Sequence, residues 1–308
     1  MTQELITLIT KHIQQKKYPG ANLALFRQQR WQEYSFGTRD GQEPLDKDAL
    51  YDLASVSKVL GVGTLCIQLY AAGRLELDVP LTAYYPAFHD SSVTIRQLLT
   101  HTSGLDPFIL HRDTLSAKEL RAAMNQLRVT GDHSFHYTDV NFVLLGFMLE
   151  YLFEQDLAQL FAQNIFTPFG MTQTSFGPRF AAVPTVQGIS DGYVHDPKAK
   201  VLGVDTGSAG LFSTLLDLEK FVAAYQASTF WDQLFQDYNS QGDRPRSLAW
   251  RLSGQWLDHT GYTGPFIMLN QTGQAAIFLT NRTYYGDDRR QWAKDRDLLM
   301  AAITKALL

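Results

Sequence analysis

The sequence predicts an α/β (α+β) fold, in which an antiparallel β-sheet is flanked by helices and carries an inserted all-helical domain. Strand patterns lie near both ends of the chain, and helical patterns fill the middle. Because a strand needs hydrogen-bonded neighbours, the strands from the two ends are expected to share one sheet. The chain has 308 residues and is 45% hydrophobic, which suits one large domain or two interleaved ones.

The individual elements follow from hydrophobic periodicity and from the Gly and Pro residues that interrupt it. The first helix stops at Pro19-Gly20, and Thr214 with Asp217 indicates a capping pair at the start of a later helix. The expected elements are a helix over 5–13, a hairpin of strands 21–26 and 31–36, helices over 56–72, 117–127, 140–153, 157–165 and 214–226, strands over 248–252, 255–259, 265–270 and 274–280, and a final helix from 288.

This order of elements divides the chain into two expected domains. Residues 1–62 and 205–308 should form a sheet-plus-helix domain, and residues 63–204 a mainly helical domain. Ligand sites occur preferentially between domains. We therefore expect the active site in the cleft between the two.

Composition excludes several classes of protein. The net charge is −4 and no basic patch stands out, so nucleic acid is not an expected partner. Cys66 is the single cysteine, which excludes an intrachain disulfide and zinc–cysteine clusters. No metal or other cofactor is expected, because His133 and His136 lack a second ligand cluster. The sequence has neither a signal-peptide pattern nor a stretch of transmembrane length, so we expect a cytoplasmic protein without membrane association.

The first chemical signal is Ser55, followed three residues later by Lys58 at a strand-to-helix transition. Residues i and i+3 share a helix face, so the Lys58 amine can reach the Ser55 hydroxyl. Serine is a poor nucleophile until a neighbour takes its proton, and a lysine of lowered pKa can do this. Taken alone, the pair also fits an ordinary helix start with Ser55 as N-cap.

Two further motifs follow in order along the chain, one over residues 137–139 and one over residues 259–261. The ordered set resembles the serine β-lactamase and penicillin-binding protein superfamily, and in particular the class C β-lactamase branch with its esterase relatives. Segments 98–105, 168–171 and 209–214 also match that branch, so the resemblance covers about residues 5 to 305. It implies a β-lactamase/transpeptidase-like fold.

The resemblance also implies a role for each motif residue. Ser55 corresponds to the acylated nucleophile, Lys58 to its proton-accepting or electrostatic partner, and Tyr137 to the residue that carries protons between nucleophile and leaving group. The backbone N–H groups of Ser55 and Tyr262 correspond to the oxyanion hole. The expected substrate-binding residues are Asp139, His259, Thr260 and Gly261.

Two residues depart from the family pattern. Asp139 stands where many members have Asn, and an ionised Asp can only accept hydrogen bonds. It is expected to pair with Lys58, which raises the pKa of the lysine and weakens it as a base. His259 stands where lactamases usually have Lys, so the anchor for a substrate carboxylate is weakened. Both departures favour a neutral substrate, unless an arginine supplies the missing charge. The candidates are Arg282, Arg289 and Arg290.

Three functions remain open on this reasoning. The first is a carboxylesterase-like serine hydrolase that forms an acyl-enzyme with a small ester or amide. The second is a β-lactamase or D,D-peptidase, and the third is a non-catalytic protein that binds an acyl compound. The expected partner is a small ester, amide or lactam, and the expected assembly is a monomer or homodimer. A rival serine motif, Gly-x-Ser-x-Gly around Ser190, requires a preceding strand and a following helix, and its surroundings indicate a loop.

Overall fold

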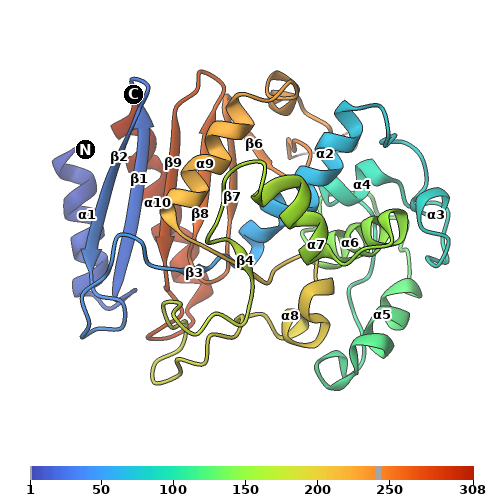
Figure 1. Cartoon of the computed structure of the whole chain (residues 1–308), viewed down its shortest axis with the longest axis horizontal. Helices are drawn as coiled ribbons and strands as arrows, with labels where there is room; N and C mark the ends of the chain where they lie inside the picture. The colour runs from blue at the N-terminus through green and yellow to red at the C-terminus, as the bar shows by residue number, and fades with distance from the viewer. Residues whose placement is uncertain (1, 240–243) are drawn as a thin grey trace.

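The computed structural model describes residues 2–239 and 244–308. Its main feature is a six-stranded antiparallel sheet beside a group of helices (Figure 1). The strand order is β2-β1-β9-β8-β7-β6, so the N-terminal hairpin joins the C-terminal strands through β1 and β9. The predicted fold class is confirmed. The strands are β1 (Gly20–Arg27), β2 (Arg30–Gly37), β6 (Arg251–Ser253), β7 (Trp256–Thr260), β8 (Phe266–Asn270) and β9 (Ala275–Thr280).

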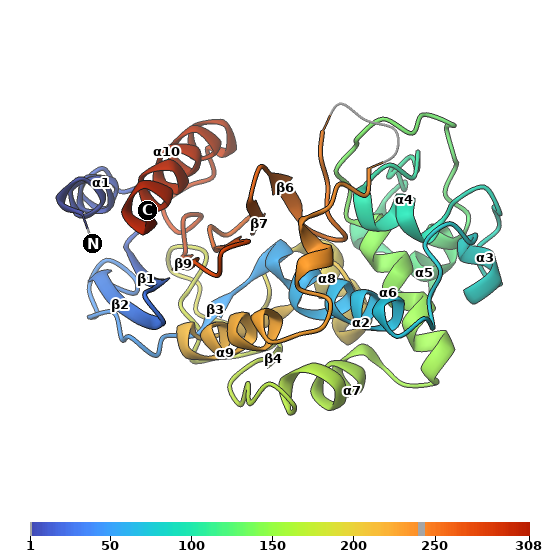
Figure 2. The same cartoon turned by 90° about the horizontal axis from the view of Figure 1, so that it is seen from above.

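Helices cover both faces of this sheet. Helices α1 (Gln3–Gln14) and α10 (Arg289–Leu307) pack together on one face, and α9 (Leu215–Gln226) covers the other (Figure 2). Every residue of β8 and β9 is therefore buried. This explains why the two strands are continuous apolar runs rather than alternating ones.

The middle of the chain supplies the helical part, which is built around α6 (Val140–Phe153). This helix is apolar on all sides, and its residues from Val140 to Leu149 are all buried. A helix of that kind belongs in the centre of a domain. The surrounding helices are α2 (Thr64–Ala71), α3 (Leu81–Tyr84), α4 (Ile95–Thr100), α5 (Ala117–Asn125), α7 (Leu157–Phe161) and α8 (Pro197–Leu202), with a π-helical turn over Ala162–Phe166 and 3₁₀ turns over Arg112–Thr114, Gly203–Asp205 and Asp232–Phe235.

A second, three-stranded sheet was not predicted. It has the order β3-β5-β4, with β3 (Tyr51–Asp52), β5 (Leu211–Ser213) and β4 (Ser175–Phe176). Strands of two or three residues leave no periodicity in a sequence. The small sheet matters for the site because it places the segment before Ser55 against the segment that follows Ser208.

Two predicted elements need correction. The helix expected over 56–72 begins at Ala54 as a 3₁₀ turn and contains a π-helical turn over Val59–Gly63. There Thr64 Oγ1 donates to the carbonyl of Val59 at 2.6 Å, which stabilises the wider turn. The strand expected over 248–252 is wrong in position, because Ala249 has a φ of +68° and breaks the extended backbone.

Judged by length and composition alone, one helical segment among the described residues could cross a membrane. It is the helical segment Ala54–Ala71, and 78% of it is buried inside the protein. Since the same segment contains Ser55 and contacts the core of the helical part, it belongs to the protein interior beside the site.

Candidate active site

Ser55 lies in the 3₁₀ turn Ala54–Val56, directly after β3. The preceding Ala54 has a φ of +45°, which is a strained conformation for a residue with a Cβ. Two contacts hold the strained turn in place. Asp52 Oδ1 accepts a hydrogen bond from the Ala54 N–H at 2.8 Å, and Leu53 N–H donates to the Leu211 carbonyl at 3.0 Å.

Lys58 is fully buried below Ser55, and each of its three N–H groups has an acceptor. Its Nζ donates to Ser55 Oγ at 2.8 Å, to Asp139 Oδ1 at 2.8 Å and to the Ser208 carbonyl at 2.9 Å. Burial alone would lower the pKa of Lys58, but Asp139 and Tyr137 outweigh burial and raise it. Lys58 is therefore a charged donor to Ser55, with no free lone pair to accept a proton.

Tyr137 lies on the cleft side of Lys58 and is partly exposed. The Lys58 Nζ is 5.2 Å from the centre of the Tyr137 ring. No direct hydrogen bond joins Tyr137 to Ser55 within the described residues. The buried His101 ring lies 4.5 Å from the tyrosine ring and accepts from Asn141 Nδ2 at 3.0 Å through its Nδ1. The structure thus places the buried His101 directly against Tyr137.

The motif at the end of β7 lies against the turn that carries Ser55. A Cβ on Gly261 would be 2.5 Å from the Leu53 carbonyl, so only glycine permits this approach. Thr263 Oγ1 donates to the Asp52 carbonyl at 2.9 Å, and Arg282 Nε donates to the Tyr262 carbonyl at 2.6 Å. These contacts fix the backbone of Tyr262 next to that of Ser55.

His259 is a buried, neutral side chain. Neither of its ring nitrogens has a hydrogen-bond partner among the residues that the structure describes. Burial, together with the charges of Lys58 and Arg246, lowers its pKa well below the usual value. Its ring lies 6.3 Å from that of Tyr137. The expected absence of a permanent charge on this residue agrees with these surroundings.

Arg246 is a cation that the sequence analysis did not identify. It is 5% exposed and lines the cleft together with His259. Its Nε and Nη2 are buried and have no hydrogen-bond partner in residues 2–239 and 244–308. Burial lowers the pKa of Arg246 to about 10, which still leaves it charged near neutral pH. The guanidinium lies 5.2 Å from the centre of the Phe135 ring.

The sequence analysis named three other arginines as possible sources of the charge, and their surroundings differ from those of Arg246. Arg282 is ion-paired with Asp287 and bound to the Tyr262 carbonyl. Arg289 lines the cleft over the ring of Tyr262, at 5.9 Å from its centre. Arg290 is exposed outside the cleft. No local pattern distinguishes Arg246 from other arginines in the sequence, because its distinguishing property is the burial of two nitrogens that have no hydrogen-bond partner in the described part of the chain.

These groups line one cleft of about 870 Å³ between the large sheet and the helical part. That volume is in the range of small-molecule sites. The cleft brings together Ser55, Tyr137, Asp139, Arg246, His259 and Tyr262.

The beta-lactamase family model matches residues 5–300. The chain belongs to the beta-lactamase family. A protein of Escherichia coli K12 named "Putative D-alanyl-D-alanine carboxypeptidase" is 26% identical over 301 residues, covering 76% of this chain and 69% of the relative. Protein flp of Staphylococcus aureus is 25% identical over 190 residues, covering 56% of this chain and 38% of the relative.

Solved structures show the same fold. SurE, in a crystal structure with D-Leu, has a TM-score of 0.75 and 21% identity, covering 99% of this chain and 75% of SurE. EstCE1, a hydrolase with promiscuous acyltransferase activity, has a TM-score of 0.75 and 18% identity, covering 96% of this chain and 97% of EstCE1. A beta-lactamase/D-alanine carboxypeptidase from Pseudomonas syringae has a TM-score of 0.73 and 20% identity, covering 96% and 99%.

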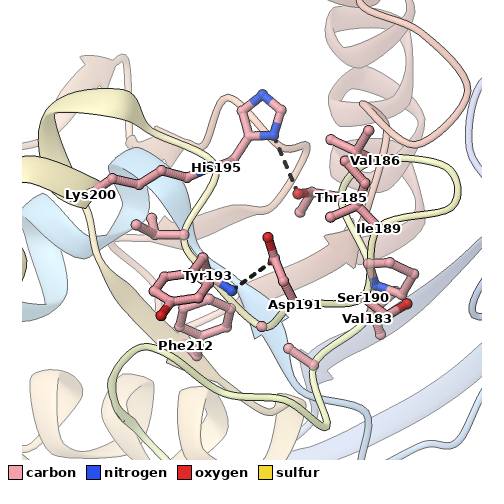
Figure 3. Close-up of a pocket in the computed structure, with 14 residues that line it drawn as sticks. Val183, Thr185, Val186, Ile189, Ser190, Asp191, Tyr193, His195, Lys200 and Phe212 are labelled. Atoms are coloured by element: carbon pink, nitrogen blue, oxygen red, sulfur yellow. Dashed lines mark hydrogen bonds between the residues drawn. The ribbon is translucent and has the colours of Figure 1, made fainter. Parts of the chain in front are cut away.

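Within this beta-lactamase-family fold, the rival serine lies outside the main cleft. Ser190 lines a separate pocket of about 80 Å³, too small for a drug-sized ester. Figure 3 shows Asp191 accepting from the Tyr193 backbone and His195 bonded to Thr185, so neither side chain binds Ser190. The residues around Ser190 form a loop, without the strand and helix that the motif requires.

Proposed function

We propose that this beta-lactamase-family serine hydrolase forms an acyl-enzyme on Ser55 from a small ester or amide whose leaving group carries a carboxylate. The observation that supports this substrate class is Arg246, a buried guanidinium in the cleft whose Nε and Nη2 have no hydrogen-bond partner among the described residues. A buried unpaired charge is costly, and a ligand carboxylate in the cleft would satisfy it. The sequence argument for a neutral substrate assumed that no such cation was present.

The proposed reaction begins with attack of Ser55 Oγ on the substrate carbonyl. Because Lys58 is a donor to Ser55 and has no free lone pair, the serine proton passes to the Tyr137 oxygen while the phenol passes its own hydrogen to the leaving group. The Ser55 and Tyr262 N–H groups bind the oxyanion, and such a donor contributes about 10²–10³ in rate. The bond between the acyl carbon and the protonated leaving group then breaks, and Tyr137 is again a neutral phenol. Water hydrolyses the ester of Ser55 by the reverse proton route.

A second candidate is a carboxylesterase for neutral short esters. The neutral His259 favours it, since this residue adds no charge at the substrate edge. The name of EstCE1, whose fold is similar, describes a hydrolase with acyltransferase activity. A D,D-peptidase or β-lactamase has a substrate carboxylate and belongs with the first candidate.

Two esters with the same acyl group separate the candidates. The leaving group of one is 3-hydroxybenzoate, which carries a carboxylate, and that of the other is 3-hydroxybenzamide, which is neutral. We expect the native protein to prefer the carboxylate ester. Arg246→Gln should lower kcat/KM for that ester by about tenfold to a hundredfold, the value of a charged hydrogen bond, and leave the amide ester unchanged. The exposed Arg290→Gln is the matched control and should change neither.

The same experiment tests the nucleophile. Ser55→Ala should abolish turnover of both esters and covalent labelling by a fluorophosphonate, while the thermal unfolding transition stays in place. A label on Ser190 would refute the acyl-enzyme on Ser55, and no label on the native protein would favour the binding protein. An equal loss of kcat/KM for both esters in Arg246→Gln would refute the preference for a leaving-group carboxylate and favour the neutral esterase.

A further inference from the structure

Lys198 is a buried lysine at the cleft that no sequence motif identified. It belongs to α8, which Figure 1 labels beside the helical part, and its side chain is 8% exposed. Its Nζ is 2.9 Å from Asp139 Oδ2 and 2.8 Å from Asp196 Oδ2. Burial alone would lower the pKa of Lys198, but the two carboxylates outweigh burial and raise it. The side chain is therefore an ammonium with three N–H donors.

Asp139, in contrast, has no donor to offer the cleft. Its Oδ1 accepts from Lys58 and its Oδ2 from Lys198. Burial would raise the pKa of Asp139, but the two ammonium groups hold it well below the usual range. An asparagine amide at this position can donate to a substrate carbonyl, and an ionised carboxylate cannot. Lys198 is the donor that lies next to Asp139 and also lines the cleft.

We propose that Lys198 donates a hydrogen bond to a carbonyl oxygen in the acyl part of the substrate, and so selects acyl groups with an amide near the reacting carbonyl. This inference rests on the proposed function. Among the described residues, Asp139 and Asp196 occupy two of its three N–H groups, which leaves one for a ligand. Lys58, Lys198 and the two aspartates have no net charge together, which suits a neutral carbonyl rather than an anion.

Arg246 and Lys198 have different neighbours in the cleft. Arg246 lies over Phe135, whereas Lys198 contacts Asp139 beside Lys58. With a leaving-group carboxylate at Arg246, the acyl part of the substrate extends from Ser55 toward Lys198. Only Asp139 separates Lys198 from Lys58, so the carbonyl bound by Lys198 belongs close to the reacting one.

The test uses two p-nitrophenyl esters of equal chain length. The acyl group of one is N-benzoylglycine, and that of the other is 4-phenylbutanoic acid, which lacks the amide. Lys198→Met should lower kcat/KM for the N-benzoylglycyl ester by about tenfold to a hundredfold, and change the other by less than about threefold. The double variant Asp139→Asn, Lys198→Met returns an amide donor beside Lys58 and should regain most of the lost preference. Lys200→Met, exposed on the same helix, is the control.

The outcomes separate this inference from the proposed function. Equal losses on the two esters, with Ser55 still labelled by a fluorophosphonate, would mean that Lys198 only neutralises Asp139, and would overturn the inference alone. Failure of the double variant to regain the preference, although it folds and is labelled, would also overturn it. Absence of label on Ser55 in the native protein would overturn the proposed function, and this inference with it.

Discussion

The three acceptors around Lys58 decide how Ser55 can be activated. A lysine acts as a general base only when its ammonium has lost a proton, which burial favours. Here Asp139 lies 2.8 Å from the ammonium and more than offsets burial. In the proposed mechanism, the charge of Lys58 stabilises the developing alkoxide of Ser55. The proposed mechanism therefore assigns proton transfer to Tyr137, whose ring lies 4.5 Å from that of His101.

The neighbours of His259 allow a prediction about charge at the substrate edge. His259→Lys would place a second cation beside Lys58 and Arg246, the two charges that already lower the pKa of the histidine. We expect kcat/KM for the 3-hydroxybenzoate ester to rise by less than about twofold, because Arg246 already supplies the charge. Steady-state kinetics with the 3-hydroxybenzoate and 3-hydroxybenzamide esters measure the change in kcat/KM, and the exposed His111→Lys is the control. A gain of tenfold or more, confined to the carboxylate ester, would contradict the role given to Arg246.

At this scale, the sequence identified the residues that lie in motifs and missed those that do not. The Ser55–Lys58 contact follows from helical spacing and is present at 2.8 Å. Arg246 and Lys198 gain their significance from burial and from charges brought together across the chain. Lys198 and Asp139 are 59 positions apart in the sequence, yet 2.9 Å apart in the fold. No spacing rule connects such a pair.

The position of the end of β7 depends on Gly261. Gly261 ends the motif after β7, and an added Cβ would be 2.5 Å from the Leu53 carbonyl. Gly261→Ala must therefore push the strand end, and the Tyr262 N–H with it, away from Ser55. Displacement by about 1 Å costs about a hundredfold in rate, so we expect a loss of that order in kcat/KM. Gly286→Ala, where nothing lies within 4 Å of the new Cβ, is the control and should retain activity. Retained activity in Gly261→Ala would argue against Tyr262 as an oxyanion donor.

The turn between β3 and Ser55 depends on the buried carboxylate of Asp52. It accepts from the Ala54 N–H at 2.8 Å and from the His195 N–H at 2.7 Å. Burial raises the pKa of Asp52 to about 6, although both hydrogen bonds act in the opposite direction. The folded state therefore binds the proton of Asp52 more tightly than the unfolded state does. Its contribution to stability is complete below about pH 4 and is lost as the pH rises through about 6.

Asp52→Asn removes this titration and gives a prediction of opposite sign for stability and activity. Relative to the native protein, the variant should gain about 1–3 kcal/mol of unfolding free energy between about pH 4 and about pH 8. Turnover should fall, because one amide oxygen replaces two carboxylate acceptors at the turn of Ser55. Urea denaturation at both pH values and ester kinetics measure the two effects. The exposed Asp48→Asn should show neither. A stability difference independent of pH would refute the raised pKa.

Element positions were predictable where periodicity was long and were wrong where local geometry intervened. Helix α6 has the predicted limits, Val140–Phe153, since fourteen residues of one pattern leave little ambiguity. The expected strand over 248–252 fails at Ala249, whose left-handed backbone depends on a tertiary hydrogen bond to the Leu99 carbonyl at 3.1 Å. The small sheet of β3, β4 and β5 has strands too short for any pattern.

For the whole molecule, the sequence predicted the sheet from both chain ends because unpaired strands are not stable in isolation. It did not predict the charge of the cleft. The net charge of the chain is −4, yet the described cleft is lined by seven arginines and Lys198 against three aspartates. The charge that a substrate meets is therefore opposite in sign to that of the chain. Net charge alone carries no information about its distribution over the folded surface.

This distribution predicts how salt affects catalysis. A cleft of one charge sign attracts a substrate of the opposite sign, and salt screens the attraction. Between about 0.01 M and 1 M salt the Debye length falls from about 30 Å to about 3 Å. Over that range we expect kcat/KM for the 3-hydroxybenzoate ester to fall about tenfold, and that for the neutral 3-hydroxybenzamide ester to change less than about twofold. Arg246→Gln should reduce the salt dependence of the first ester only. Equal salt dependence of the two esters would show that the arginines serve the fold rather than the substrate.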